Sequence, residues 1–253
     1  MTYPAPLFWD YTNLAASYDK RADYNAELLR QVLQGLAMRS TDCVLEVGAG
    51  TGKLTQHLVQ HASTLIALEP NAAMRAEALR KPSLSGVQWL AGSGERLPLR
   101  SASVVLVAYG SSFNVLDPIV ALDECARVLQ PQGHWLALWN HRDLSDPLQQ
   151  TVEQLIRKHL PDYDPGSRRQ SPIPVLERHG GFTNVAFAEG RFTLEMPSAE
   201  WLQAWKAHAT LQRQAGAQLP RILADIAALV EGQANLCLPY WTRVWTAQKK
   251  STA

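Results

Sequence analysis

The chain has 253 residues, of which 46% are hydrophobic and 19% charged, a balance typical of a folded globular protein and too apolar for a disordered one. Lysine and arginine number 24, and aspartate and glutamate 23. This even charge argues against a nucleic-acid partner, because such partners favour a clear basic excess. The chain also lacks an apolar run of about 18 residues, which a membrane-spanning helix needs.

The first 140 residues alternate between short apolar runs and amphipathic stretches. Apolar residues three and four apart predict helices, whereas a uniformly apolar run predicts a parallel strand buried on both faces. In chain order we expect a helix at 22–36, a strand at 43–47, a helix at 54–61, a strand at 64–68, a helix from residue 71, strands at 87–91 and 104–108, a helix at 117–129 and a strand at 134–139. This alternation indicates an α/β fold with a doubly wound, mostly parallel sheet.

The pattern becomes less regular after residue 140, although no internal repeat or low-complexity linker interrupts it. We expect a helix at 148–159, a hairpin that pairs 182–187 with 191–195, helices at 199–214 and 220–231, and a final strand at 240–246. The chain is therefore predicted to be one domain with an insertion. Its parts are an N-terminal helical lid (1–40), an α/β core (41–195), a helical cap insertion (196–235) and the last core strand (236–253).

A glycine-rich loop follows the first predicted strand, in the sequence Val-Leu-Glu-Val-Gly-Ala-Gly-Thr-Gly-Lys that ends at Lys53. Glycines directly after a strand let the backbone turn sharply and approach a ligand where a Cβ atom would collide. A dinucleotide fingerprint needs its third glycine three positions after the second, and Lys53 occupies that position. The loop therefore departs from the pattern of NAD-binding proteins. A turn without a ligand is the structural alternative.

The loop resembles the first motif of the class I S-adenosylmethionine-dependent methyltransferases, an acidic residue followed by three glycines at alternate positions. Glu46, Gly48, Gly50 and Gly52 occupy these positions. The resemblance implies a Rossmann-like methyltransferase fold with a seven-stranded sheet, and S-adenosyl-L-methionine as the cofactor. It also implies that Glu46 orients the methionine end of the cofactor and that the glycines face its backbone atoms.

Two further segments resemble cofactor-binding motifs of this family. Glu69 ends the second predicted strand, where the family's acidic residue accepts hydrogen bonds from both ribose hydroxyls, and two acceptor oxygens suit a vicinal diol. Met74 resembles the residue that packs on adenine, with packing in the helix core as the alternative. In the segment 92–99, Ser93 stands where the family has an aspartate, and its hydroxyl and the backbone of Gly94 are expected to face adenine.

The residues after the fourth and fifth predicted strands are candidates for catalysis. Small-molecule members of the family often carry a histidine where this chain has Asn114. Asparagine is no base near neutral pH, so His141 is the candidate general base, and an exposed loop histidine is the alternative. The candidate catalytic residues are Tyr109, Asn114, Asn140 and His141. Methyl transfer also proceeds without a strong base where the protein holds donor and nucleophile in line and excludes water.

Aromatic side chains and a basic residue are candidates for contacts to the cofactor's sulfonium and carboxylate. Aromatic faces attract a sulfonium through cation–π interaction, and the candidates are Tyr11, Tyr18, Tyr109 and Trp139. Tyr18-Asp-Lys-Arg21 resembles the family's lid over the methionine end. Arg21 is predicted to pair with the cofactor's carboxylate, and an ordinary surface arginine is the alternative.

The predicted cap carries two tryptophans, Trp201 and Trp205, four residues apart and therefore on one helix face. They either pack the cap against the sheet or line an aromatic substrate pocket. The segments 124–133 and 238–245 also resemble the methyltransferase family, so the resemblance extends over nearly the whole chain. It is specific for the cofactor and silent on the acceptor.

These observations predict an S-adenosylmethionine-dependent methyltransferase that acts on a small molecule, with no nucleic-acid, membrane or metal partner. One alternative is a cyclase that converts the cofactor to azetidine-2-carboxylate and releases methylthioadenosine. Another is a protein that binds the cofactor without catalysis. The three cysteines fit neither a disulfide framework nor a metal-ligand spacing, and the N-terminus lacks the pattern of a signal peptide. We therefore expect a cytoplasmic enzyme.

Overall fold

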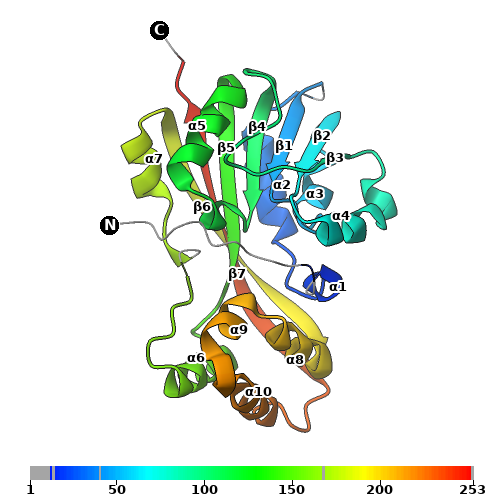
Figure 1. Cartoon of the computed structure of the whole chain (residues 1–253), viewed down its shortest axis with the longest axis vertical. Helices are drawn as coiled ribbons and strands as arrows, with labels where there is room; N and C mark the ends of the chain where they lie inside the picture. The colour runs from blue at the N-terminus through cyan, green and yellow to red at the C-terminus, as the bar shows by residue number, and fades with distance from the viewer. Residues whose placement is uncertain (1–11, 13–14, 40, 167–168, 252–253) are drawn as a thin grey trace.

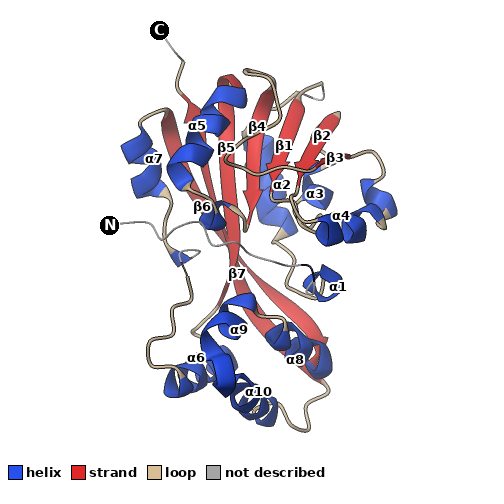
Figure 2. Cartoon of the chain, in the orientation of Figure 1, coloured by secondary structure: helices blue, strands red, loops and turns tan. Residues whose placement is uncertain are grey.

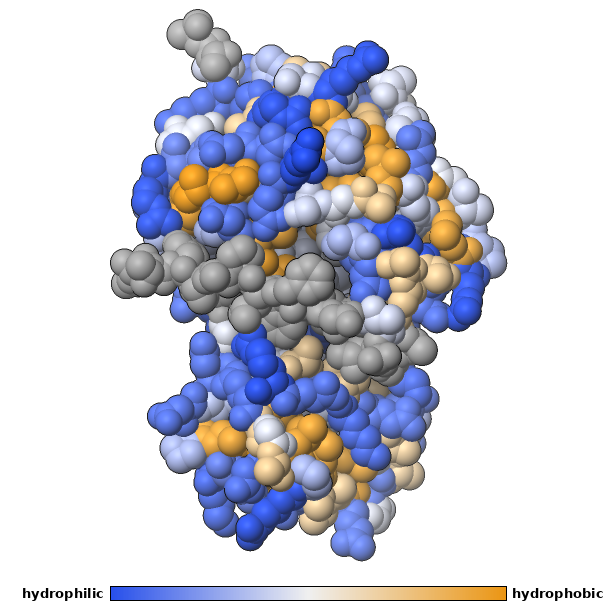
Figure 3. Space-filling view, viewed as in Figure 1, coloured by the Kyte–Doolittle hydropathy of each residue, from blue (hydrophilic) through white to orange (hydrophobic). Residues whose placement is uncertain are grey.

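The chain folds into two lobes that share the longest strands of one sheet (Figure 1). The computed structural model describes residues 12, 15–39, 41–166 and 169–251. The larger lobe is an α/β sandwich, and the smaller lobe packs helices around the far ends of two strands (Figure 2). A narrower waist joins the lobes in the space-filling view (Figure 3).

Within the described residues, seven strands form a sheet in the order β3-β2-β1-β4-β5-β7-β6. The strands are β1 (Cys43–Val47), β2 (Thr64–Leu68), β3 (Gln88–Leu90), β4 (Val104–Gly110), β5 (Leu129–Arg142), β6 (Phe182–Pro197) and β7 (Asn235–Lys249). Strands β1 to β5 run parallel to one another, whereas β7 pairs antiparallel with β5 and β6. The predicted doubly wound, mostly parallel sheet is confirmed.

Several helices begin at side chains that cap them. Asn71 accepts hydrogen bonds from Ala73 and Met74 at the start of α4, and Asp117 caps α5, which has proline in its first turn. The α-helices of the described residues are α1 (Ala15–Tyr18), α2 (Ala26–Gly35), α3 (Thr55–Leu58), α4 (Ala72–Leu79), α5 (Pro118–Val128), α6 (Pro147–His159), α7 (Ile173–His179), α8 (Ser198–Lys206), α9 (Ala209–Ala215) and α10 (Leu219–Ala228).

Both faces of the central strands are buried, as their uniformly apolar sequence predicts. Successive residues of β4 alternate between two cores: Val107 packs with residues of α5 and α7, whereas Leu106 packs with residues of α2, α3 and α4. The carboxyl ends of β1, β2 and β4 therefore meet at one edge of the sheet, next to the smaller lobe (Figure 1). In doubly wound sheets this edge is where ligands bind.

The smaller lobe, which we call the cap, has an apolar core of its own. Helices α8, α9 and α10 pack there with the first residues of β7, through Trp201, Trp205, Leu211 and Ile222. Residues of α6 belong to the same core, and this helix lies outside the boundaries 196–235 predicted for the insertion. The cap thus gathers two segments that are separated by α7 and most of β6.

The predicted hairpin between 182–187 and 191–195 is wrong, because β6 is one continuous strand paired with β7 from Phe182↔Lys249 to Pro197↔Asn235. Gly190, which marked the supposed turn, lies within β6. A Cβ atom there would meet Nδ2 of Asn25 at 2.9 Å, so this glycine allows close packing instead of a turn.

The predicted helix 199–214 is two helices, because the chain breaks at His208. The His208 side chain accepts a hydrogen bond from the backbone of Leu211 and so caps α9. In the part of the chain that the structure describes, none of the helices has the length and apolar character needed to cross a membrane.

Candidate functional site

The glycine loop leaves β1 at Val47 and turns through three glycines with positive φ, at +69° for Gly48, +57° for Gly50 and +86° for Gly52. A Cβ atom on Gly48 would meet Ser112 Cβ at 2.5 Å, and one on Gly52 would meet Leu84 Cδ1 at 2.4 Å. Around Gly50, by contrast, no described atom lies within 4 Å of that position. Gly48 and Gly52 are needed for internal packing, whereas Gly50 faces open space.

Glu69 follows β2 and is 7% exposed. Its carboxylate accepts hydrogen bonds from the backbone N–H groups of Gly50 at 2.9 Å and Asn71 at 2.8 Å. Burial raises the pKa of Glu69, although these two hydrogen bonds oppose the rise. A carboxylate has about four lone-pair sites, so capacity remains for donors from a ligand. Glu69 thus shapes the glycine loop from the edge of the sheet.

Glu46, the second-last residue of β1, is a second buried carboxyl group at this edge, with 1% exposure. The hydroxyl of Thr55 donates to it at 2.6 Å. Burial raises the pKa of Glu46 to about 8; the Thr55 hydrogen bond lowers it and the nearby Glu69 raises it further. A carboxyl group so placed is ready to be stabilised as an anion by a cationic ligand.

The segment after α1 is fastened to the glycine loop by Asp19. Its carboxylate accepts a hydrogen bond from the Thr51 hydroxyl and forms an ion pair with Lys81 at 2.7 Å. Lys53 donates to the backbone carbonyl of Asp19 at 2.9 Å. On the other side, Lys20 donates to Gln203 of α8 at 2.6 Å. The predicted lid residues therefore contact both the core and the cap.

A cavity of about 590 Å³ lies between the glycine loop, the lid segment and the cap. Eight of the predicted site residues line it: Tyr18, Arg21, Glu46, Gly48, Gly50, Asn114, Asn140 and His141. Its size falls within the range of small-molecule sites. The structure thus brings the methionine-end residues and most of the candidate catalytic residues to one space.

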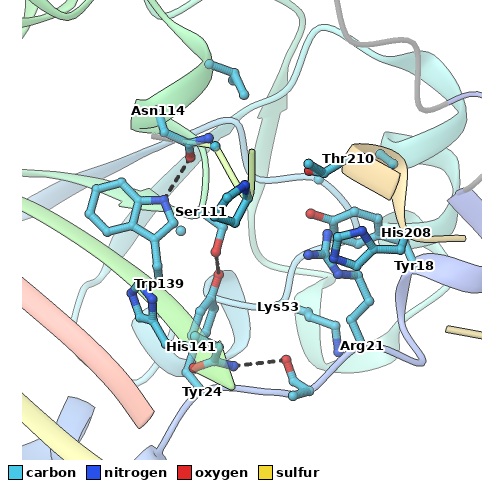
Figure 4. A pocket seen from close by; sticks show the side chains of 18 of the residues that line it. Tyr18, Arg21, Tyr24, Lys53, Ser111, Asn114, Trp139, His141, His208 and Thr210 are labelled. Carbon is cyan, nitrogen blue, oxygen red and sulfur yellow. Dashed lines mark hydrogen bonds between the residues drawn. The ribbon is translucent and has the colours of Figure 1, made fainter. Parts of the chain in front are cut away.

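Tyr18 and Arg21 lie on the lid side of the cavity, with the Arg21 guanidinium 4.8 Å from the centre of the Tyr18 ring. Figure 4 shows them with His208 and Thr210 of the cap on one side, and with Trp139, Asn114 and Tyr24 on the other. The predicted role of Arg21 toward a cofactor carboxylate stays a prediction. Tyr11 lies outside the described residues.

Tyr24 and Ser111 are site residues that the sequence analysis missed. The Tyr24 and Ser111 hydroxyls are hydrogen-bonded at 3.0 Å, and both residues line the cavity (Figure 4). Ser111 directly follows β4 and has a φ of +59°, a conformation that non-glycine residues adopt mainly where structure or function requires it. Burial raises the pKa of Tyr24, which keeps the hydroxyl protonated and available as a donor. A tyrosine in a loop carries no sequence signal for this placement.

Two candidate catalytic residues have side chains engaged by the protein itself. The Asn114 carbonyl oxygen accepts from the Trp139 indole at 2.8 Å. The Asn140 amide donates to the carbonyls of Ala22 at 3.2 Å and Asp23 at 2.8 Å, and it accepts from Thr242 at 2.6 Å. Asn140 thus joins β5 and β7 to the lid segment and positions the wall of the cavity.

His141 lines the cavity from β5 with 9% exposure. It lies at the end of the strand, paired across the sheet with Trp241. The alternative of an exposed loop histidine does not hold, because His141 lies within β5 and is buried. Its role as a general base stays a prediction.

The expectation that Tyr109 contacts the cofactor does not match its position. Its side chain is fully buried, packs edge-on against Phe113 with ring centres 5.2 Å apart, and contacts Trp135 in the core beneath α5. Side chains alternate along a strand, so the neighbouring Gly110, and not Tyr109, faces the cavity. The position of the strand in the sheet decides which residues face the cavity, and the sequence motif alone does not show this.

The predicted ribose and adenine contacts lie beyond the cavity wall. Glu69, Met74, Ser93 and Gly94 are absent from its lining, as is Gly52 of the glycine loop. Met74 is 2% exposed on α4. The exposed Ser93 hydroxyl donates to Glu95, and Gly94 packs against Leu116 and Val47. Their roles toward ribose and adenine stay predictions.

The cap wall is aromatic and basic. Trp201 and Trp205 are each 4% exposed, and they fill the core of the cap while also lining the cavity. The pair thus packs within the cap and borders the cavity, and its contact with a substrate stays a prediction. The Trp205 ring also contacts the Arg142 guanidinium, 4.8 Å from its centre, and stacks on His208.

Known proteins match the same parts of the chain. The family described as "Methyltransferase domain" matches residues 45–137. An uncharacterized methyltransferase from Mycobacterium tuberculosis is 32% identical over 173 residues, which are 67% of this chain and 68% of that protein. An uncharacterized methyltransferase from Schizosaccharomyces pombe is 33% identical over 148 residues, and the match spans 58% of its length.

A solved structure shows the same fold at lower identity. The YcgJ protein from Bacillus subtilis superimposes with a TM-score of 0.58 and 16% identity, covering 90% of this chain and 100% of that one. The sheet order, the glycine loop and the sequence relatives lead to one conclusion: the chain belongs to the class I S-adenosylmethionine-dependent methyltransferases.

Proposed function

We propose that this enzyme methylates a small molecule, which binds in the cavity between the glycine loop and the cap. The observation that carries this proposal is the shared lining. Glu46, Gly48 and Gly50 bound the same space as Trp201 and Trp205 of the cap. A donor site and an acceptor site therefore adjoin without an intervening wall, as direct transfer requires.

The residues present fit S-adenosylmethionine. Gly50 faces open space in which a Cβ atom would protrude, and Glu46 and Glu69 supply buried carboxyl groups at the ends of β1 and β2. We place the methionine end beside Glu46, Gly50 and Arg21, and the ribose beside Glu69. When bound, the cofactor would supply an activated methyl group. The acceptor's nucleophile would take the methyl carbon while the electron pair of the carbon–sulfur bond passes to sulfur and the acceptor's proton leaves.

The chain's own residues then orient and enclose the reactants. The lid segment, fastened through Asp19, and the cap helices cover the cavity and exclude water. The hydrogen-bonded pair of Tyr24 and Ser111 and the Asn114 amide, fixed by Trp139, offer polar groups to an acceptor. His141 is the candidate to take the acceptor's proton. A nucleophile that carries no proton would need no such base.

The reaction product tests this function. Purified enzyme is incubated with S-adenosylmethionine, with and without a library of small acceptors, and both nucleoside products are followed by chromatography. We expect S-adenosylhomocysteine in the presence of the right acceptor and little turnover without one. Rapid formation of methylthioadenosine without an acceptor would overturn the proposal in favour of cyclisation. Cofactor binding without turnover for any acceptor would favour a binding protein.

A further inference from the structure

Three arginines surround one carboxylate where the cavity meets the cap. Glu153 of α6 forms ion pairs with Arg142 at 2.7 Å, with Arg157 at 3.1 Å and with Arg169 at 3.2 Å. One negative charge thus faces three positive charges. The group as a whole keeps an excess of positive charge.

The ion pair at the centre of this cluster is largely shielded from water. The side chains of Glu153 and Arg142 are 9% and 11% exposed, whereas those of Arg169 and Arg157 are 28% and 45% exposed. Burial alone would raise the pKa of Glu153, but the arginines lower it overall. Burial lowers the pKa of Arg142, which Glu153 opposes, and a guanidinium keeps its charge in either case. Because the two further arginines leave the cluster with excess positive charge, it attracts an anion that enters the cavity.

Arg142 retains hydrogen-bonding capacity. Its Nη2 atom is used by Glu153, whereas its Nη1 atom, buried as well, has no hydrogen-bond partner among the described residues. The guanidinium also contacts Trp205, with its carbon 4.8 Å from the centre of the ring. A planar donor held in place by such contacts loses little entropy when it binds an anion.

The cavity wall as a whole has the same charge bias. Its basic residues are Lys20, Arg21, Lys53, Arg142, Arg169, Arg178 and Arg213, and its acidic residues are Glu46 and Asp164. Asp164 is exposed and accepts a hydrogen bond from Gly166 in its own loop. Glu46 lies at the opposite end, in the glycine loop's corner. The cap end is therefore positive.

We propose that the acceptor is an anion, a carboxylate or a phosphate ester, whose charged group binds Arg142 and Arg169 at the cap end of the cavity. This inference rests on the proposed function, since it takes the cavity as the acceptor site. The apolar or aromatic part of the acceptor contacts Trp201 and Trp205. Guanidinium groups favour both anions because their donors match two oxygens at once.

The chain offers a matched set of variants to test this proposal. Arg142 and Arg169 line the cavity, whereas Arg157 contacts the same Glu153 from outside it. Arg142→Gln, Arg169→Gln and Arg157→Gln each remove one positive charge beside Glu153. Only the first two remove a donor from the cavity wall. Thermal unfolding identifies any variant that is not folded, and Arg169, on a loop, keeps the test available if Arg142→Gln does not fold.

Calorimetry on enzyme saturated with S-adenosylhomocysteine provides the measurement. A panel of aliphatic and aromatic carboxylates and phosphate esters is titrated alongside the neutral amide or alcohol of the same shape. We expect at least one anion to bind tenfold or more tightly than its neutral counterpart. For that anion, Arg142→Gln and Arg169→Gln should weaken binding at least tenfold and Arg157→Gln less than twofold. The better of the two anion types identifies carboxylate or phosphate.

Two results would overturn the proposal: no anion binding more tightly than its neutral counterpart, or equal losses in all three variants. The preceding titration of S-adenosylhomocysteine into the wild type keeps the proposed function separate. If that ligand does not bind, the cofactor site is wrong. If it binds and the anions show no preference, the cofactor site stands and the acceptor class is wrong.

Discussion

Glu46 and Glu69 are buried carboxyl groups at the ends of adjacent strands, and they differ in how they are compensated. Glu69 accepts two backbone hydrogen bonds, whereas Glu46 has the Thr55 hydroxyl. The less compensated group has the pKa that is raised to about 8. It is therefore the one whose protonation should respond to a cationic ligand near neutral pH.

The raised pKa of Glu46 makes a prediction about pH. The folded protein binds a proton here that the unfolded chain releases above its ordinary pKa of 4.5, so stability from this group is present below pH 4.5 and is lost as pH rises toward 8. Glu46→Gln should therefore stabilise the ligand-free protein at pH 8 by a few kcal/mol, each pKa unit being worth about 1.36 kcal/mol, and should change it little at pH 4.5. Denaturant unfolding at the two pH values measures this difference. Equal effects at both would contradict it.

Gly50 gives a second prediction at this scale. Gly50→Val should abolish binding of S-adenosylhomocysteine, because its side chain would enter the open space beside the loop. Gly232→Val is the matched control: Gly232 also has positive φ and open space around it, and it lies outside the cavity lining. Both variants should be destabilised by about 1–2 kcal/mol through backbone strain, but only the first should lose the ligand. Calorimetric binding together with thermal unfolding separates the two effects.

At the scale of elements, Asn140 holds three segments together. Its side chain connects β5 to the carbonyls of Ala22 and Asp23 and to Thr242 of β7. Asn140→Ala should lower the free energy of unfolding by about 1–3 kcal/mol, since it leaves polar partners unsatisfied. Gln31→Ala, which removes one exposed hydrogen bond to Glu27 within α2, is the control and should have little effect.

The same variant distinguishes positioning from direct participation. If Asn140 acts by fixing the lid segment, its loss should also speed proteolytic cleavage near residue 22 in the ligand-free protein. Unchanged stability and cleavage, combined with a large loss of turnover, would instead assign Asn140 to the chemistry. Limited proteolysis with mass spectrometry gives the position and the rate.

At the scale of the whole molecule, the sheet and the glycine loop were predictable because their signals are local. Uniform apolar runs mark buried strands, and the three glycines of residues 48–52 adopt the positive φ angles that their own turn requires. The Tyr109 side chain was expected in the site but lies in the core. Which face of β4 each side chain occupies depends on how the strand sits in the sheet beside β5. Tyr24 and the arginines around Glu153 were missed because they come from segments that are far apart in the sequence. Their spacing along the chain does not indicate that they lie close together in the fold.

The continuous pairing of β6 and β7 also limits how the molecule moves. The two strands pair through the waist without a break, and β5 pairs there up to Arg142↔Tyr240. We therefore predict that the lobes stay fixed relative to one another, because separating the paired strands would break several hydrogen bonds at once. We also predict that ligands enter past the segment 15–23, which contacts both lobes through side chains.

Hydrogen exchange would directly compare the stability of the paired strands β6 and β7 with that of the segment 15–23. The amides of 190–194 and 240–242 that donate across this ribbon of paired strands should exchange slowly with or without ligand, since opening them breaks paired strands. Amides of 19–23 should exchange quickly in the free enzyme and slow at least tenfold when S-adenosylhomocysteine binds. Fast exchange of the paired ribbon amides would contradict this prediction. A ribbon that stays paired while the segment 19–23 opens would let cofactor and acceptor reach the cavity past that segment.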